Sequence, residues 1–259
     1  MTVFLYDSSF QGLLCATCEL LNAVAAGQDP DDMRVSGAGT EAGLFEERLI
    51  VNCDPARAER LVARLEGSFG EELPILLRDA FASDLGGVDG ALARLVARLF
   101  REGSRVLDDL GDEDVRLVER AADRTRRAAH LMTGFLRFSE LSDGSLVSTI
   151  EPDCDILPLI AGHFAARYPS LRWAIKDGRR DRALVHEPGR GWRGGEALSI
   201  SGKAAPSWRE GQVAEVWRSY FDIVSIEDRK NPGLQASRLP KKYRKHMGEF
   251  DARAGKETG

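Results

Sequence analysis

Long apolar stretches and cysteine are both scarce in this sequence of 259 residues. No apolar run approaches the length needed to span a membrane, and the first residues lack the basic region and hydrophobic stretch of a secretory signal. Only four cysteines are scattered along the chain, which favours reduced thiols over a disulfide framework. We therefore expect a soluble, cytoplasmic protein.

Motifs that bind nucleotide cofactors are also missing. The sequence has neither a Walker-type Gly-x-x-x-x-Gly-Lys motif nor a Gly-x-Gly-x-x-Gly motif after a predicted strand. The pair Cys15-Ala-Thr-Cys18 lies inside a predicted helix among leucines, and Cys53 and Cys154 are isolated in the sequence. We interpret these cysteines as buried apolar residues, and we predict no metal site, no cofactor and no catalytic residue.

Acidic and basic residues are distributed unevenly. The formal net charge is −5, but residues 1–160 carry −13 and residues 161–259 carry +8. The segment 229–246 has seven Lys or Arg residues, no Asp or Glu, and one tyrosine, Tyr243. Cations attract phosphates and an aromatic ring can stack on a base, so this segment predicts nucleic-acid binding. A solvated basic tail, and an acidic half that docks a basic protein, are the alternatives.

The first 84 residues predict a β-α-β-α segment. An apolar run at 3–6 is followed by Asp7-Ser8-Ser9, which can cap a helix over 10–24. Residues 27–43 are rich in Gly and Asp and predict a loop, whereas 48–51 predict a strand. Asp54 before Pro55 is typical of the start of a further helix.

Residues 85–259 predict helices and two hairpins, either as a second domain with a basic tail or as one compact unit with 1–84. Amphipathic patterns predict helices, the longest from about Asp112 to residue 133. Asp143-Gly144 and Asp177-Gly178 offer the turns of two hairpins on either side of a helix over 155–168, and residues 188–211 predict a loop. We therefore expect an α+β fold with a four-stranded antiparallel sheet covered by helices on one face.

Two groups of polar residues offer alternative sites. One helix face gathers Arg116, Arg120, Arg124 and Arg127, which could contact phosphates, although interleaved acidic residues favour a solvated face with ion pairs. The hairpins could also bring two histidines to three carboxylates, which are His130, His163, Asp153, Asp155 and Asp177. Such a group could bind a metal for phosphodiester hydrolysis. We favour a structural interpretation, because carboxylates at helix starts and a histidine at a core edge are common.

The second half of the chain carries four distinctive motifs. They are Ala129-His130-Leu-Met-x-Gly134-Phe-x-Arg137-Phe138, Ile150-Glu-Pro-Asp-x-Asp155-Ile-Leu-Pro-Leu-Ile160, His163-Phe164-x-x-Arg167-Tyr168-Pro169, and a closing signature of Trp217, Tyr220-Phe221, Glu227, Arg229, Asn231, Gln235 and Pro240-x-x-Tyr243. Together they resemble a little-characterised bacterial family associated with DNA metabolism and DNA repair. The resemblance implies a radical-SAM DNA-repair protein as partner, and the family's domain also occurs fused to uracil-DNA glycosylases. Motifs of a glycosylase or a radical-SAM enzyme are absent from this sequence, so the resemblance implies a process and not a reaction.

Our leading hypothesis is an accessory, non-catalytic protein of DNA repair or DNA metabolism. A basic C-terminal module would bind DNA, and the acidic half would bind a partner repair protein, which the resemblance implies to be the radical-SAM protein. The predicted nucleic-acid-binding residues are Arg229, Lys230, Asn231, Gln235, Arg238, Lys241, Lys242, Tyr243, Arg244 and Lys245. Two alternatives stay open: a hydrolytic enzyme acting on nucleic acid, and a protein-interaction adaptor without DNA contact.

Overall fold

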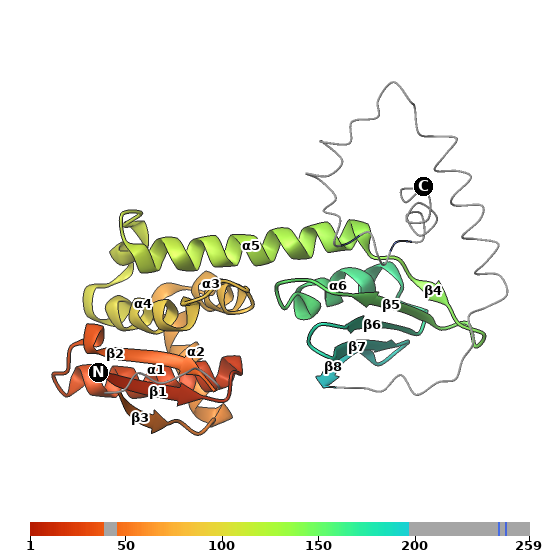
Figure 1. The fold of residues 1–259 in the computed structure, drawn as a ribbon. Helices are drawn as coiled ribbons and strands as arrows, with labels where there is room; N and C mark the ends of the chain where they lie inside the picture. The colour runs from red at the N-terminus through yellow and green to blue at the C-terminus, as the bar shows by residue number, and fades with distance from the viewer. Residues whose placement is uncertain (39–45, 197–242, 244–246, 248–259) are drawn as a thin grey trace, which may run out of the picture. The chain divides into compact units, whose positions relative to one another are not determined.

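A computed structural model of the chain describes residues 1–38, 46–196, 243 and 247 (Figure 1). The chain divides into two compact units, unit 1 (residues 1–126) and unit 2 (residues 127–259), and the division falls inside helix α5 (Glu113–Phe135). Unit 1 has 14 basic and 24 acidic residues and a formal charge of −10, whereas unit 2 has 22 and 17 and a charge of +5. Within the described ranges, every helix is too short or too polar to cross a bilayer.

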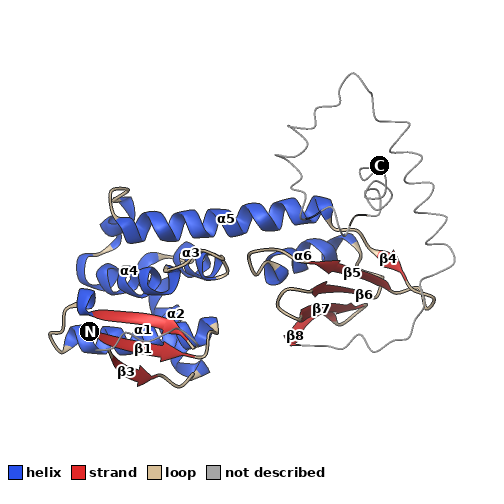
Figure 2. Cartoon of the chain, in the orientation of Figure 1, coloured by secondary structure: helices blue, strands red, loops and turns tan. Residues whose placement is uncertain are grey.

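Unit 1 contains a three-stranded parallel sheet. Strand β1 (Thr2–Tyr6) lies between β2 (Met33–Gly37) and β3 (Glu47–Ile50), and both neighbours run parallel to it (Figure 2). The predicted β-α-β-α opening is present, but β2 lies within residues that we predicted to be a loop. Its two buried side chains, Met33 and Val35, alternate over too short a stretch to be recognised among the surrounding Asp and Gly residues.

Local capping residues begin the helices that follow β1 and β3. Helix α1 (Phe10–Ala25) starts after Ser9, whose hydroxyl accepts a hydrogen bond from the N–H of Gly12 at 2.9 Å. Helix α2 (Pro55–Phe69) starts after Asp54, whose carboxylate accepts hydrogen bonds from two N–H groups of the first turn. Caps of this kind stabilise a helix start by about 1 kcal/mol. Because they act within a few residues, the sequence predicts both starts.

The remaining helices of unit 1 complete its core. They are α3 (Glu72–Phe81), α4 (Val88–Glu102), the first part of α5, and the short 3-10 helices η1 (Pro30–Asp32) and η2 (Ser104–Asp108). Phe4 and Tyr6 from β1 pack in one apolar cluster with side chains such as Leu13 of α1 and Leu95 of α4. This cluster holds α1 and α2 against the sheet. Because β1 and β3 run parallel, their C-terminal ends lie at the same edge of the sheet, and α1 and α2 begin at that edge.

Unit 2 contains a five-stranded mixed sheet. Its strands are β4 (Ser139–Glu140), β5 (Leu146–Ile150), β6 (Trp173–Asp177), β7 (Arg182–Glu187) and β8 (Gly191–Glu196), and they follow one another in this order across the sheet (Figure 1). Helix α6 (Leu157–Arg167) connects β5 to β6. The β5–β6 pair is parallel, and the other three pairs are antiparallel.

The α+β class, both Asp-Gly hairpins and the helix between them are confirmed. The expectation of four antiparallel strands is wrong in two respects. First, β5 and β6 run parallel, because a crossover helix brings the chain back to the end of the sheet at which β5 begins. Second, β8 adds a fifth strand within residues that we predicted to be a loop. Its three glycines and single large apolar residue, Trp192, show no alternation of apolar and polar residues.

Candidate nucleic-acid interface

Nine of the ten predicted nucleic-acid-binding residues lie outside the described residues, and the tenth, Tyr243, lies in the core of unit 2. Its side chain and that of Met247 are buried, with exposed fractions of 9% and 3%. The Tyr243 ring lies 6.3 Å from the ring of Phe135, near the end of α5, with an angle of 36° between the ring planes. The sequence places Tyr243 in the middle of four cations, Lys241, Lys242, Arg244 and Lys245.

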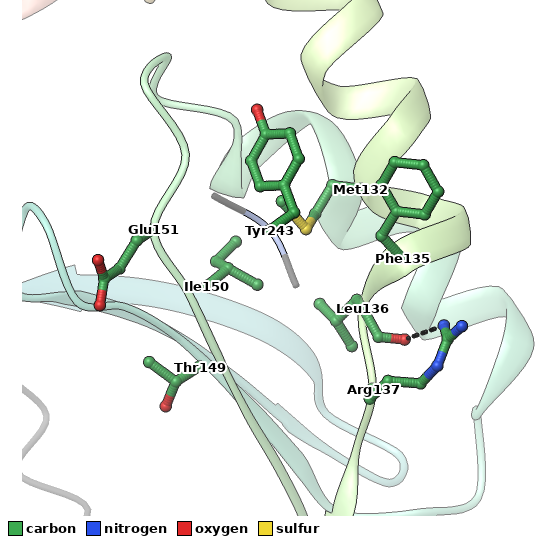
Figure 3. A pocket seen from close by; sticks show the side chains of 8 residues that line it. All are labelled: Met132, Phe135, Leu136, Arg137, Thr149, Ile150, Glu151 and Tyr243. Atoms are coloured by element: carbon green, nitrogen blue, oxygen red, sulfur yellow. Dashed lines mark hydrogen bonds between the residues drawn. The ribbon is translucent and has the colours of Figure 1, made fainter. Parts of the chain in front are cut away.

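Tyr243 lines a small pocket that is apolar at its centre and polar at its rim (Figure 3). Met132, Leu136 and Ile150 line it beside Phe135, and the remaining lining residues are Arg137, Thr149 and Glu151. The free space between these side chains is about 10 Å³, close to the minimum volume that holds one water molecule. A ring seated in this way cannot stack on a base without leaving the core. Its burial therefore favours packing within the fold over stacking on a base.

Arg137 closes the end of helix α5. Its Nη1 donates hydrogen bonds to the carbonyl oxygens of Gly134 at 2.8 Å and Leu136 at 3.3 Å, the second of which Figure 3 shows. A guanidinium at this position satisfies carbonyls that the helix leaves without partners, and its charge suits the negative end of the helix dipole. Arg137 thus fixes the last turn of α5, which carries Phe135 against Tyr243.

The predicted arginine face of α5 is partly engaged in ion pairs within unit 1. Arg124 forms a two-point ion pair with Asp84, with Nη2 at 2.8 Å from Oδ2. Its neighbour Arg126 donates to the buried carboxylate of Asp79 at 2.8 Å. Arg116 and Arg120 are exposed. This arrangement supports the interpretation of a solvated face with ion pairs, although the partners of Arg124 and Arg126 come from α3 and the segment after it.

The three carboxylates of the hydrolytic alternative each meet an arginine from the β6–β7 turn. Asp153 pairs with Arg179 at 2.6 Å, Asp155 pairs with Arg182, and the fully buried Asp177 pairs with Arg180 at 3.0 Å. Asp177 also accepts hydrogen bonds from two N–H groups of the turn that follows it. These contacts give the carboxylates a structural role, since the pairs of Asp153 and Asp155 fasten the β6–β7 hairpin to the segment that leads into α6 and those of Asp177 hold the turn within the hairpin.

The histidines of that alternative do not complete a metal site. His130 is exposed on α5, and His163 is exposed on α6, with its ring edge-to-face on Phe164 at 5.0 Å. No three His, Cys, Asp or Glu side chains among the described residues are placed to hold a metal ion together.

Sequence reasoning did not single out His186, which is 4% exposed on β7. Its ring stacks on Trp173 with a centroid distance of 5.0 Å and an interplanar angle of 6°, and its Nδ1 lies 2.9 Å from the carbonyl oxygen of Leu171. Donation from Nδ1–H to this carbonyl fixes the tautomer. The alternation of Leu184 and His186 on one strand face was the available signal of its burial.

Cys53 is only partly buried, contrary to our interpretation of the four cysteines as buried residues. Although it is isolated in the sequence, its thiol lies close enough to Cys15 and Ser9 for both to influence its pKa. The buried Cys15 sulfur in turn contacts the backbone N–H and the carbonyl oxygen of Asp54, both at 3.3 Å. The parallel pairing of β1 and β3 brings these segments together, because parallel strands end at the same edge of a sheet. All four cysteines are present as free thiols.

Comparison with known proteins identifies a family for most of this chain. Residues 87–249 match the family model of the domain of unknown function DUF4130. Neither the curated proteins nor the solved structures yielded a match. The predicted domain boundary after residue 84 stays a prediction, since the match begins at residue 87 and the compact units divide after residue 126. Because the match covers more than half of its residues, the chain belongs to the DUF4130 family.

Proposed function

We propose that this protein is an accessory factor of DNA repair or DNA metabolism that binds nucleic acid through the basic segment 229–246. The burial of Tyr243 carries the proposal. Lys241 and Lys245 are two positions from Tyr243, and two residues span at most about 7 Å of chain. We propose that the anchoring of Tyr243 concentrates these four flanking cations near one point. A tethered cluster loses less conformational freedom on binding phosphates than the same cations on a free tail.

The charge of the two units supports a division of roles. Unit 2 carries +5 and attracts phosphates, whereas unit 1 carries −10 and repels them. Exposed acidic side chains on α2 and at the start of α3, namely Glu59, Glu66, Glu71 and Glu72, suit a basic surface on a partner protein. The resemblance of the sequence motifs makes a radical-SAM DNA-repair protein the partner that we propose for unit 1.

A salt series with a charge-reversed variant tests the nucleic-acid role. We expect Lys241→Glu/Lys242→Glu to weaken binding to single- and double-stranded DNA regardless of sequence. Each lost phosphate contact lowers the slope of log affinity against log salt by about 0.7–0.9, so two lost contacts lower it by roughly 1.4–1.8. Fluorescence anisotropy of labelled oligonucleotides at several salt concentrations measures both quantities.

Arg101→Glu/Arg105→Glu is the matched control, because it changes the net charge equally but places the change on exposed residues of unit 1. We expect this control to leave the salt slope unchanged. Equal DNA affinity of the wild type and the folded Lys241→Glu/Lys242→Glu variant would reject DNA binding by this segment and support the adaptor hypothesis.

A further inference from the structure

Two thiols lie close together at the edge of the unit 1 sheet where β1 and β3 end. Cys15 lies in the second turn of α1 and is fully buried, whereas Cys53 lies just before the cap of α2 and is partly exposed. Cys15 is close enough to influence the pKa of the Cys53 thiol. Cys53 is therefore accessible to a small solute, whereas Cys15 is not.

The backbone geometry allows a bond between the two sulfurs. The Cys15 sulfur lies 3.3 Å from the backbone nitrogen of Asp54, which is separated from the Cα of Cys53 by only two covalent bonds, a distance of about 2.4 Å. The Cα of Cys53 is thus within about 6 Å of the Cys15 sulfur. Rotation of the Cys53 side chain can then turn its sulfur toward the Cys15 sulfur, which is the approach that a disulfide requires.

The other cysteines are placed differently. Cys18 is on the same helix as Cys15, but burial raises the pKa of its thiol and the nearby Arg57 on α2 opposes that effect. Cys154 is buried in unit 2. We propose that Cys15 and Cys53 form an oxidation site that hydrogen peroxide converts into an intramolecular disulfide, closing a loop that contains β2 and β3 and joining α1 to the start of α2.

The chemistry balances in two steps. The Cys53 thiolate attacks one peroxide oxygen, the O–O bond breaks, and the products are a sulfenic acid and a hydroxide that takes up a proton to become water. The Cys15 sulfur then attacks the Cys53 sulfur, the S–O bond breaks, and the departing hydroxide takes the Cys15 proton. Two thiols lose two electrons and two protons, and one peroxide is reduced to two waters.

The surroundings of Cys53 set the conditions for this reaction. Partial burial and the nearby Asp7 carboxylate raise the pKa of the Cys53 thiol, and its contact with Cys15 adds to this effect, while Ser9 opposes it. The thiolate fraction at neutral pH is therefore below that of a free cysteine. The pair stays reduced under mild conditions, and its rate of oxidation rises with pH until the thiol has ionised.

Peptide mapping after oxidation tests the site on the full-length protein. The reduced chain is treated with excess hydrogen peroxide, its remaining thiols are blocked with N-ethylmaleimide in denaturant, and the peptides are analysed by mass spectrometry. We expect two of the four thiols to be protected and a peptide joined through Cys15 and Cys53, about 2 Da lighter than its two parts. The melting temperature of the oxidised protein should rise, on the order of 10 °C, and fall again after dithiothreitol.

Three single variants decide the assignment. Cys53→Ser replaces a partly exposed thiol with a hydroxyl, and it should abolish both the protection of Cys15 and the reversible thermal shift. Cys18→Ala and Cys154→Ala should leave both unchanged. A bond between Cys15 and Cys18, oxidation of Cys53 to sulfinic acid without a bond, or four alkylated thiols after peroxide treatment would each overturn the proposal.

Discussion

The replacement of Tyr243 by alanine is the most informative perturbation of the C-terminal segment, because two roles of this residue predict opposite results. The ring is 9% exposed and packs with Phe135 beside a small pocket with room for about one water molecule. Burial of a large apolar side chain contributes about 1.5–3 kcal/mol, and truncation of a buried aromatic residue costs roughly 3–5 kcal/mol. The polar rim gives water access to the pocket, so we expect a cost of about 2–4 kcal/mol for Tyr243→Ala.

Thermal unfolding and DNA binding together measure this effect. For a unit of this size, a loss of 2–4 kcal/mol lowers the melting temperature by on the order of 10 °C. Tyr243→Phe retains the ring and should cost no more than about 1.5 kcal/mol, the contribution of one hydrogen bond. If Tyr243 tethers the four flanking cations, its loss should also weaken DNA binding and lower the salt slope, because fewer phosphates are contacted at once.

Stacking on a base predicts a different combination. The affinity for single strands would fall by roughly 1–3 kcal/mol, with an unchanged salt slope and an unchanged melting temperature. That result for Tyr243→Ala would refute the anchoring role that we infer from its burial.

Two further predictions concern unit 1. Asp112 caps α5 by accepting a hydrogen bond from the N–H of Val115 at 2.9 Å, and it pairs with Arg98. We expect Asp112→Ala to lower the free energy of unfolding, measured in urea, by about 0.5–2 kcal/mol. The control Asp108→Ala, at an exposed position, should cost little. Partial burial raises the pKa of Asp112, but the Val115 N–H and Arg98 outweigh it and hold that pKa below its usual value. The stabilising charge is therefore fully present above about pH 4 and is lost as pH falls through the lowered pKa, so the difference between wild type and Asp112→Asn should shrink below pH 4. A difference that stays constant as pH falls below about 4 would contradict this account. Gly12→Ala would place a Cβ 2.1 Å from the Asp7 carboxylate, which already accepts hydrogen bonds from Ser9, and it should cost about 1–3 kcal/mol of stability. Gly67→Ala, in open space on α2, should instead stabilise the protein by up to about 1 kcal/mol. Equal melting temperatures of the two variants would disprove the steric argument.

Local interactions made part of this fold predictable from the sequence. The hydroxyl of Ser9, the carboxylates of Asp54 and Asp112, and the Asp-Gly turn residues each act on N–H groups no more than a few positions away. A cap or a tight turn depends on so short a stretch that its residues specify it without the rest of the chain. Helix periodicity is similarly local, so the longest helix, α5, was predicted close to its observed bounds.

Tertiary structure alone decided which distant segments meet. The parallel β5–β6 pairing, the contact of Cys15 with Cys53, the ion pair of Arg124 with Asp84 and the burial of Tyr243 against Phe135 all join positions far apart in the sequence. Strands β2 and β8 likewise owe their extended form to the backbone hydrogen bonds of a neighbouring strand, because their own side chains carry little strand pattern. Composition and spacing indicated which residue types were available for chemistry. Their partners were set by packing, since contacts between distant segments form only when the whole core excludes water.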